Sequence, residues 1–282
     1  MQNKIVAIIG AGVMGCATAL DVAWHGHNVI LKDISTDVLN IAENRIRQEY
    51  RSACIFRREY REISIDDIIN RIRIQSDYDG IQEADIVIEN IIEDVESKIL
   101  EYGRLKELCK HALYALNTSC LPITKLASYL PNPSKVIGVH FMNPVPLKET
   151  VEVIKGYHTS AETENDMVEF LVHMKKRPIV IQDFPGFVSN RLSHLFMNEA
   201  AFAVQDGVAT PTQVDEIMCG GFNHKMGPLR TADLIGLDTV ANSLDVLYRC
   251  YQDSKFRCCP LLRKMVDAGK LGVKSGEGFF KY

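Results

Sequence analysis

A glycine-rich segment near the N-terminus constrains the fold of this chain more than any other feature of its sequence. The segment, Gly10-Ala-Gly12-Val-Met-Gly15, has the pattern G-x-G-x-x-G. It follows a short apolar run, Lys4 to Ile9, and precedes a stretch with helical spacing of apolar residues, Met14 to His25. Between a strand and a helix, the first glycine makes a tight turn, the second lets the backbone approach a pyrophosphate, and the third allows close packing.

An acidic residue after the next predicted strand extends this pattern. The run Asn28 to Lys32 ends at Asp33, which lies 18 residues after Gly15 (33 − 15). A carboxylate at that place accepts hydrogen bonds from the ribose hydroxyls of adenosine and repels a 2′-phosphate. No arginine follows in Ile34 to Thr36. The pattern therefore predicts an NAD site, and it disfavours both NADP and a glycine turn without a ligand.

Strand and helix patterns alternate through the first two thirds of the chain. The segment from about residue 37 to 73 is rich in Arg, Glu and Ile and predicts a helical hairpin, and Val95 to Lys110 predicts a further helix. This alternation is typical of an α/β Rossmann fold with a doubly wound parallel sheet. Further predicted strands are Asp85 to Glu89, Leu113 to Asn117, Val136 to Val139 and Pro178 to Ile181.

The pattern of apolar residues changes after Asp183-Phe-Pro-Gly186, where strand-like runs stop and amphipathic helical stretches begin. We therefore expect an NAD-binding domain in residues 1–185 and a C-terminal all-helical domain in residues 186–282. The amphipathic stretches of the second domain are Val188 to Asp206, Thr212 to Cys219, Leu229 to Tyr251 and Pro260 to Ala268.

Composition excludes several classes of protein. The 282 residues are 46% hydrophobic and 24% charged, which is ordinary for a globular chain. The formal charge of −4 gives no net attraction to nucleic acid or anionic lipid. No apolar run approaches the roughly 20 residues that span a bilayer, and no signal peptide is recognisable. Eight scattered cysteines favour reduced thiols in the cytoplasm over disulfides or a metal site.

Polar residues follow the predicted strands of the first domain. In an open α/β sheet the ligand lies at the carboxyl ends of the strands, so Asn117-Thr-Ser119, His140 and Glu152 are expected to converge. A histidine can remove the proton of a carbinol hydroxyl as hydride leaves the carbon, and a carboxylate can orient the imidazole. The spacing of 12 residues proves nothing by itself, because a buried or surface histidine fits it equally well.

Six blocks of sequence together resemble the L-3-hydroxyacyl-CoA dehydrogenase family, and they occur in the family's order from end to end. The resemblance implies a Rossmann domain followed by a helical domain that forms a homodimer. The blocks are Gly10 to Gly15, Asn117-Thr-Ser119, His140-Phe-Met-Asn-Pro-Val-Pro146 with Val151-Glu-Val-Ile154, Asp183 to Arg191, Met226-Gly-Pro228 with Asp233 to Asp238, and Lys274 to Phe279.

The same resemblance assigns residues to roles. It implies that His140 is the catalytic base, that Glu152 orients it, that Ser119 binds the 3-oxygen of the substrate, and that Asn190 helps to hold substrate and imidazole. Without it, Glu93 with Lys98 would be interpreted as a solvated pair and Lys274 as an ordinary tail residue. The expected NAD site comprises Gly10, Gly12, Val13, Met14, Gly15, Asp33, Glu93, Lys98, Asn117, Ser119, Asn143 and Lys274.

The chain departs from the family in the hairpin, where lysines that meet coenzyme A are replaced by arginines. Arg51, Arg57 and Arg58 are the expected contacts to the thioester arm. Arginine binds phosphate well, but a basic and aromatic surface also fits an acidic carrier protein, and a solvated helix face fits equally. Two further departures from the family are Lys225, where the family usually has a proline, and Leu147 to Thr150, where the family has a more apolar segment before Val151. With Asn117 to Pro122, these features resemble enzymes acting on carrier-bound hydroxyacyl groups in polyketide extender-unit (hydroxy- or methoxymalonyl) synthesis.

The sequence thus predicts an NAD-dependent dehydrogenase that oxidises an L-3-hydroxyacyl thioester, carried by CoA or an acyl carrier protein, to the 3-oxoacyl thioester. This activity belongs to fatty acid metabolism or, with carrier-bound substrates, to polyketide biosynthesis. One alternative is a catalytically idle NAD-binding scaffold, which would need none of the four catalytic candidates. Another is a dehydrogenase of free hydroxy or sugar acids, which would leave the basic hairpin unexplained.

Overall fold

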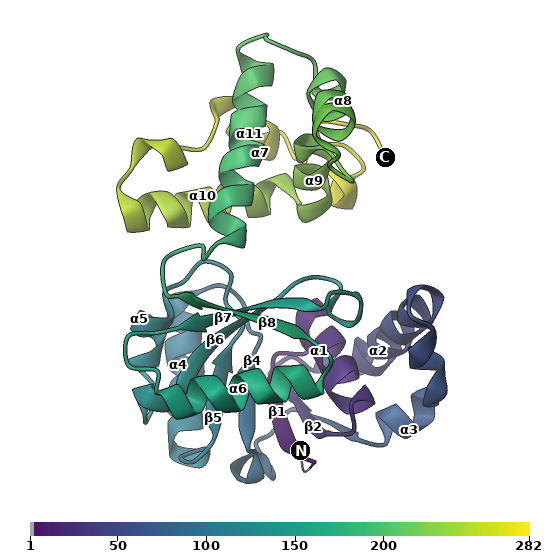
Figure 1. Ribbon diagram of the computed structural model, residues 1–282, viewed down its shortest axis with the longest axis vertical. Coiled ribbons are helices and arrows are strands. Elements are labelled where there is room, and N and C mark those ends of the chain that lie inside the picture. Colours follow the sequence, from purple (N-terminus) through teal and green to yellow (C-terminus); the bar gives the residue numbers. More distant parts are fainter. Residues whose placement is uncertain (1–2) are drawn as a thin grey trace. The chain divides into compact units, whose positions relative to one another are not determined.

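A twisted eight-stranded sheet forms the centre of the N-terminal unit in the computed structural model, which describes residues 3–282 (Figure 1). This unit extends to Asp183, and a second unit comprises Phe184–Tyr282. The strand order is β3-β2-β1-β4-β5-β6-β7-β8. The strands are β1 (Ile5–Ile9), β2 (Asn28–Lys32), β3 (Ile72–Gln75), β4 (Ile86–Glu89), β5 (Leu113–Leu116), β6 (Val136–Phe141), β7 (Thr150–Lys155) and β8 (Arg177–Gln182).

Helices cover both faces of this sheet (Figure 1). Small and apolar side chains of α1 pack with those of α6 in the main core on one face, and α4 and α5 lie on the other. Burial on both faces explains why β1 is a continuous apolar run and why β4 is apolar up to its last residue, Glu89. The helices are α1 (Val13–Trp24), α2 (Thr36–Phe56), α3 (Ile65–Ile69), α4 (Val95–Leu108), α5 (Ile123–Ala127) and α6 (Ala161–His173), with short 3₁₀ turns η1 (Arg58–Glu62), η2 (Ile81–Glu83), η3 (Pro133–Lys135) and η4 (Val145–Leu147).

The structure confirms the α/β Rossmann class but corrects the expectation of a wholly parallel sheet. Strand β7 runs antiparallel to β6, and β8 is parallel to β7. A short connection, residues 142–149, returns the chain beside β6, which an antiparallel pair permits and a parallel crossover does not. The prediction that ended the strand at Val139 was also too short, because β6 continues through Phe141.

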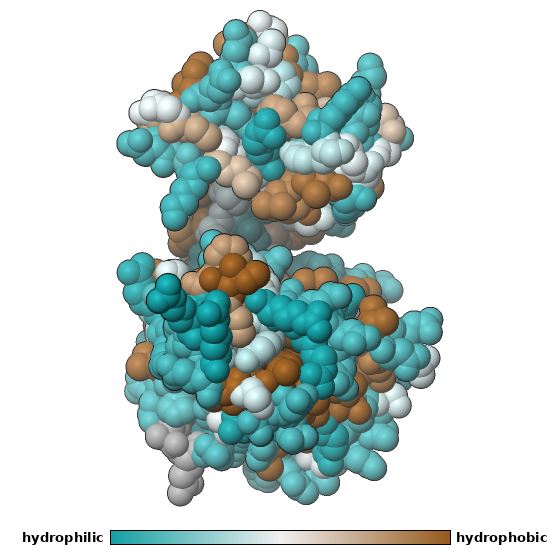
Figure 2. Space-filling model, turned by 90° about the vertical axis from the view of Figure 1, so that its right-hand side faces the viewer, coloured by the Kyte–Doolittle hydropathy of each residue, from teal (hydrophilic) through white to brown (hydrophobic). Residues whose placement is uncertain are grey.

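The predicted hairpin ends sooner than expected. Helix α2, η1 and α3 form it, but residue 72 already begins β3, a parallel neighbour of β2. This strand was missed because it is an edge strand in which Arg73 and Gln75 alternate with isoleucines. Figure 2 looks at the side of the molecule on which the hairpin lies, and brown apolar side chains there are surrounded by teal polar ones.

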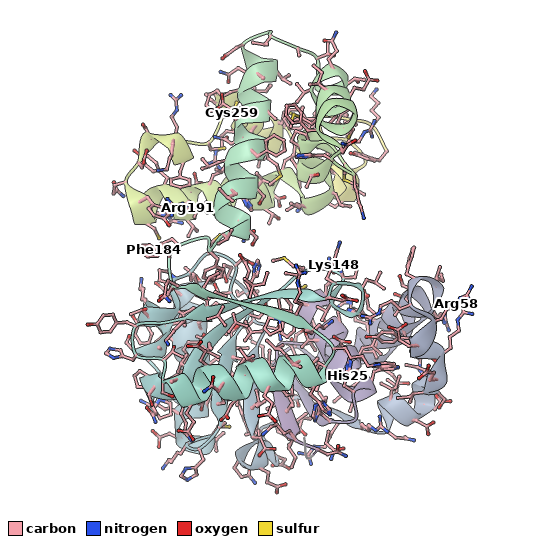
Figure 3. All side chains as sticks on the ribbon, viewed as in Figure 1. His25, Arg58, Lys148, Phe184, Arg191 and Cys259 are labelled. Atoms are coloured by element: carbon pink, nitrogen blue, oxygen red, sulfur yellow. The ribbon has the colours of Figure 1, made fainter. Side chains whose placement is uncertain are left out.

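The C-terminal unit is helical and has its own hydrophobic core. Leu229 to Tyr251, taken as one stretch from the sequence, is two helices that meet at Gly236, whose φ of 104° favours glycine. Cys259 lies fully buried inside this unit (Figure 3). Its helices are α7 (Ser189–Gln205), α8 (Pro211–Phe222), α9 (Pro228–Ile235), α10 (Leu237–Tyr251) and α11 (Pro260–Asp267), with the 3₁₀ turns η5 (Ser254–Phe256) and η6 (Val273–Ser275). Across residues 3–282, none of the helices combines the length and apolar character needed to cross a bilayer.

Candidate active site

The glycine loop between β1 and α1 has one glycine for each of three physical needs. Gly10 has φ of 102°, and a Cβ there would lie 2.6 Å from the carbonyl oxygen of Asn90. A Cβ on Gly15 would lie 1.8 Å from the carbonyl oxygen of Gly10. A Cβ on Gly12, by contrast, would meet no protein atom within 4 Å. The backbone at Gly12 therefore faces open space at the N-terminus of a 12-residue helix, where a phosphate group is favoured.

Asp33 is fixed at the end of β2 by two backbone donors. Its Oδ2 accepts a hydrogen bond from the amide of Ala11 at 2.7 Å, and its Oδ1 accepts one from the amide of Ser35 at 2.9 Å. It lines a pocket of about 410 Å³ beside the glycine loop. The apolar side chains Ile34, Ile92 and Leu100 line the same pocket and are more than 60% exposed. Their exposure fits a pocket that receives a flat, largely apolar ring system.

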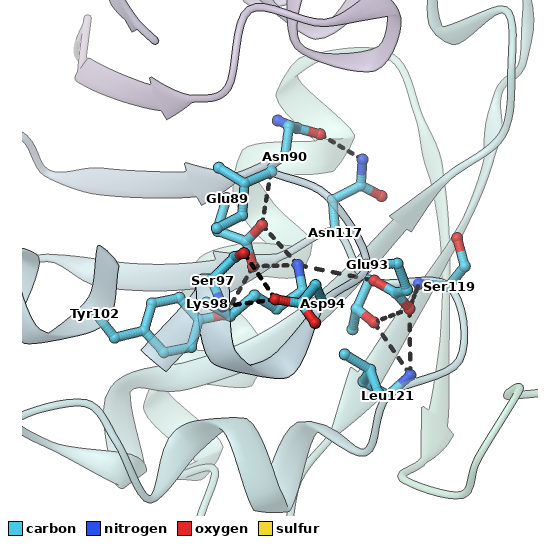
Figure 4. A network of polar contacts seen from close by, with 12 residues as sticks. Glu89, Asn90, Glu93, Asp94, Ser97, Lys98, Tyr102, Asn117, Ser119 and Leu121 are labelled. Carbon is cyan, nitrogen blue, oxygen red and sulfur yellow. Dashed lines mark hydrogen bonds and ion pairs between the residues drawn. The ribbon is translucent and has the colours of Figure 1, made fainter. Parts of the chain in front are cut away.

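A buried ion pair lies beneath the loop that follows β4 (Figure 4). Lys98 and Glu89 are both fully buried, and Nζ of Lys98 lies 2.8 and 2.9 Å from the two carboxylate oxygens. The hydroxyl of Tyr102 donates to Oε2 of Glu89 at 2.7 Å, and burial together with this carboxylate raises the pKa of Tyr102 well above its ordinary value. The interpretation of Lys98 as one half of a solvated pair is therefore wrong, because the side chain is buried. Its partner Glu89 was not indicated by the sequence.

Glu93 lies between this ion pair and the loop that contains Ser119, and it holds that loop in place (Figure 4). Its Oε1 accepts hydrogen bonds from the hydroxyl of Thr118 at 2.5 Å and from the amides of Ser119 and Cys120 at 2.9 Å each. Its other oxygen lies 3.7 Å from Nζ of Lys98. The carboxylate thus fixes the backbone of a predicted substrate residue.

Asn117 connects three strand ends. Its Nδ2 donates to the side chain of Asn90 at 2.5 Å, and its Oδ1 accepts from the amide of Phe141 at 3.1 Å. These residues follow or end β5, β4 and β6. The predicted residue Asn117 therefore ties the carboxyl ends of the central strands together, at the edge where a ligand is expected in this fold.

His140 and Glu152 are brought together by the antiparallel pairing of β6 with β7. They are direct cross-strand partners, and Nδ1 of His140 lies 2.9 Å from Oε2 of Glu152. Their exposed fractions are 8% and 6%. The carboxylate orients the ring through this contact. Contrary to the prediction that they follow strand ends, both lie within strands.

A second buried ion pair supports the loop after β6. Nζ of Lys176 lies 2.6 Å from Oδ2 of Asp21 and donates to the carbonyl oxygens of Val145 at 2.6 Å and Lys148 at 3.0 Å. The hydroxyl of Tyr60 in the hairpin donates to the same carboxylate. The hairpin, α1 and this loop are therefore joined through one buried carboxylate, which sequence patterns did not indicate.

The remaining predicted residues are more dispersed. Val13, at the start of α1, and Asn143, after β6, are exposed, whereas Met14 is half-buried against the core. Asn190 lies at the start of α7 and Lys274 in η6, both in the C-terminal unit, where Lys274 forms an ion pair with Asp238 at 2.6 Å.

The hairpin arginines differ from one another. Arg57 is bound to Glu59 at 2.6 Å and donates to the carbonyl oxygen of Pro146 at 3.1 Å. Arg51 and Arg58 are exposed, and no residue in the described range 3–282 forms an ion pair with either; Figure 3 shows Arg58 projecting from the hairpin.

All eight cysteines lie in the described part of the chain, and none of them forms a disulfide there. Burial raises the pKa of Cys16, beside the glycine loop, to about 11, so that its thiol is unreactive at neutral pH. Residues 3–282 contain no group of three or more His, Cys, Asp or Glu side chains arranged to hold a metal ion.

Two family models match the chain and together cover almost all of it. Residues 5–184 match the NAD-binding domain of 3-hydroxyacyl-CoA dehydrogenase, and residues 186–282 match the C-terminal domain of 3-hydroxyacyl-CoA dehydrogenase. The first match includes the glycine loop and the His140–Glu152 pair, and the second begins just before Asn190.

Known proteins resemble the chain over its full length. It is 43% identical to a probable 3-hydroxybutyryl-CoA dehydrogenase of Bacillus subtilis, over 100% of this chain and 98% of that protein. It is 37% identical to a 3-hydroxybutyryl-CoA dehydrogenase of Clostridioides difficile, over 98% and 99%. The crystal structure of (S)-3-hydroxybutyryl-CoA dehydrogenase from Ralstonia eutropha superposes with a TM-score of 0.92 at 35% identity, covering 100% of this chain and 99% of that one.

Proposed function

Because the chain belongs to the 3-hydroxyacyl-CoA dehydrogenase family of NAD-dependent oxidoreductases that act on CH–OH groups, we propose that it oxidises a short L-3-hydroxyacyl-CoA to the 3-oxoacyl-CoA. The observation that carries this proposal is the buried pair His140–Glu152, at 2.9 Å, at the end of the sheet where the glycine loop also lies. The names of relatives at 43% and 37% identity favour 3-hydroxybutyryl-CoA as the substrate to test first.

In this reaction His140 is the general base. With the Nδ1–H of its ring donated to Glu152, the Nε2 atom carries the lone pair that takes the proton of the substrate's 3-hydroxyl. The positive charge that develops on the ring is stabilised by the carboxylate 2.9 Å away. Bound NAD would supply the acceptor for the hydride on the carbon that bears this hydroxyl. In the reverse direction the protonated ring returns the proton to the 3-oxo oxygen.

The loop after β5 positions the substrate oxygen in this proposal. Ser119 donates a hydrogen bond to the 3-oxygen, and Glu93 keeps the backbone of Ser119 in place through the amide hydrogen bond at 2.9 Å. On the family resemblance alone, Asn190 of the C-terminal unit is a further proposed catalytic residue. Glu93 therefore acts on the substrate through Ser119, in addition to the cofactor contact expected from the family resemblance.

The N-terminal unit fits NAD at the glycine loop. The open space at Gly12 accommodates the pyrophosphate, and Asp33 accepts hydrogen bonds from the adenosine ribose. Of the other predicted contacts, Lys98 is fully buried, and it supports the cofactor site through its ion pairs with Glu89 and Glu93. The remaining proposed cofactor residues are Gly10, Val13, Met14, Gly15, Asn117, Ser119, Asn143 and Lys274.

A carrier protein is the second candidate for the thiol that bears the acyl group, and the hairpin surface favours it. Ile55 and Phe56 are 69% and 71% exposed at the end of α2, with Arg51 and Arg58 close by in sequence. An apolar centre flanked by unpaired arginines complements an acidic helix with apolar side chains. The same arginines also suit the phosphates of CoA. Carrier-bound substrates would place the protein in polyketide extender-unit synthesis rather than in fatty acid metabolism.

The protein is proposed to be a homodimer and to be located in the cytoplasm. Val208, Ile217 and Phe222, on or beside α8 of the C-terminal unit, are 78%, 59% and 66% exposed, which supports an interface there. The absence of disulfides among residues 3–282 supports a reducing compartment. A monomeric mass in light scattering at micromolar concentration would contradict the dimer.

The activity is tested by incubating the purified protein with NAD and (S)-3-hydroxybutyryl-CoA and measuring NADH formation. His140→Gln is expected to lower kcat by about 10² to 10⁴ while NAD binding is unchanged, since a general base supplies a factor of that size. The matched control is His111→Gln, an exposed histidine that should leave kcat unaltered. If no 3-hydroxyacyl thioester yields NADH, the result favours a catalytically idle NAD-binding scaffold. Turnover of free hydroxy acids alone would favour a dehydrogenase of free hydroxy or sugar acids.

A side-by-side comparison separates CoA from a carrier protein. If the carrier is the partner, Phe56→Ser should lower kcat/KM for 3-hydroxybutyryl-carrier protein about tenfold and leave kcat/KM for the CoA ester unchanged. Tyr157→Ser, at a residue that is 83% exposed in the same unit, is the control. Equal rates for the two substrates, both insensitive to Phe56→Ser, would reject the carrier as the specific partner.

A further inference from the structure

The pocket beside the glycine loop holds two positive charges that the predicted NAD contacts do not include. Lys32, the last residue of β2, and Arg104, on α4, both line the pocket that Asp33 lines. Lys32 is 1% exposed, whereas the side chain of Arg104 is half-exposed. Cations beside the adenosine ribose are the groups with which enzymes bind the 2′-phosphate of NADP.

One carboxylate engages both of these cations. Oε1 of Glu101 lies 3.1 Å from Nζ of Lys32, and its Oε2 lies 3.9 Å from the guanidinium of Arg104. Tyr78 closes the cluster, since its hydroxyl lies 2.8 Å from Nζ of Lys32 and donates to Glu101 at 2.9 Å, while Nζ lies 4.2 Å from the centre of its ring. Glu101 itself is 6% exposed and is reached by little water.

The charges of the pocket cancel because of this arrangement. Asp33 and Glu101 supply two negative charges, and Lys32 and Arg104 supply two positive charges. Without the charge of Glu101 the same pocket would carry a net positive charge, with a lysine no longer held by an ion pair beside the ribose. A doubly charged 2′-phosphate would then meet attraction instead of a neutral site.

We propose that Glu101 is a specificity-determining residue of the cofactor site, which holds Lys32 and Arg104 in ion pairs and so keeps the enzyme selective for NAD over NADP. It acts together with Asp33, whose carboxylate is held by the amides of Ala11 and Ser35. Two residues therefore share the selectivity: Asp33 accepts hydrogen bonds from the ribose, and Glu101 keeps Lys32 and Arg104 in ion pairs so that they do not bind a 2′-phosphate.

The test measures, by calorimetry on the full-length protein without NAD, the affinity of the cofactor site for adenosine 2′,5′-bisphosphate and for ADP, with kcat/KM for NADP and NAD as the second readout. Glu101→Gln is expected to raise the affinity for the 2′-phosphorylated probe tenfold or more and to change the affinity for ADP less than twofold. Glu101→Asp, which keeps the charge, should retain the selectivity of the native protein. Glu107→Gln, at an exposed position of the same helix, is the control and should change neither affinity.

An unchanged ratio of the two affinities in folded Glu101→Gln would overturn the proposal, as would an equal rise in Glu107→Gln. If Glu101→Gln does not fold, Arg104→Gln decides the question, because it removes one of the two cations at a half-exposed position and leaves the pocket with a net negative charge. A threefold or greater fall in the affinity for the 2′-phosphorylated probe relative to ADP then supports the proposal, and an unchanged ratio refutes it. The binding readout does not depend on the acyl substrate, so failure of the proposed reaction leaves this test interpretable.

Discussion

Replacing Lys98 by methionine should destabilise the N-terminal unit strongly. Lys98 and Glu89 are both 0% exposed, so the substitution leaves a buried carboxylate without its cation. Breaking such a pair costs about 3–5 kcal/mol. The lower value, about 3 kcal/mol, is expected because the hydroxyl of Tyr102 and the amide of Ile91 still donate to Glu89, each at 2.7 Å. For a unit of this size that corresponds to a fall in Tm of about 6–12 °C.

The assay is thermal unfolding followed by circular dichroism without NAD, at one protein concentration. The matched control is Lys106→Met, an exposed lysine on the same helix, which should change the free energy of unfolding by less than about 0.5 kcal/mol. Adding Glu89→Gln to Lys98→Met should restore much of the loss, because the uncompensated charge is then removed. A loss below about 1 kcal/mol in Lys98→Met, or an equal loss in the control, would refute the assignment of a structural ion pair.

Three further predictions concern the same unit. Burial, and next the neighbouring His173, lowers the pKa of His27 to about 4, so between pH 6.5 and 4 the unfolded chain binds one more proton than the folded one. The free energy of unfolding therefore decreases as the pH is lowered through that window. His27→Asn should reduce this pH dependence by about 1.4 kcal/mol per pH unit, as measured by urea titration. Gly12→Ala should fold normally yet weaken NAD binding tenfold or more in a fluorescence titration, whereas Gly15→Ala, with its Cβ against a backbone carbonyl, should lose about 1–3 kcal/mol of stability. Glu93→Gln should lower kcat/KM for the hydroxyacyl substrate about tenfold, because a neutral amide holds the Ser119 loop by weaker hydrogen bonds, and unchanged kinetics would contradict that role.

The parts of the fold that were predictable from sequence are those in which local pattern and burial coincide. The apolar run of β1, the glycine loop and the run of β2 ending at Asp33 identify a Rossmann fold because each has a local physical requirement. Strand β3 lacks such a signal, since one of its faces is polar at the sheet edge. The break at Gly236 was also missed, because the apolar spacing continues on both sides of it.

The supporting charges of the site were not predictable for a different reason. Glu89 ends a strand and Lys98 lies nine positions later on a helix, so nothing in their spacing indicates that their side chains meet. Lys176 and Asp21 are still farther apart in sequence, and both belong to segments that would otherwise be interpreted as surface. Tertiary packing alone determines that these charges are buried in pairs.

The error in the predicted sheet and the spacing of the proposed catalytic pair have one common explanation. A parallel neighbour for β6 would require a crossover of a dozen or more residues, and the 12 positions between His140 and Glu152 then give no reason for contact. The antiparallel β7 returns after residues 142–149 and makes the two residues cross-strand partners. A shift of the pairing by one residue would turn the side chain of Glu152 to the opposite face of the sheet, away from the imidazole. The departure from a parallel sheet is therefore what brings the carboxylate to the histidine.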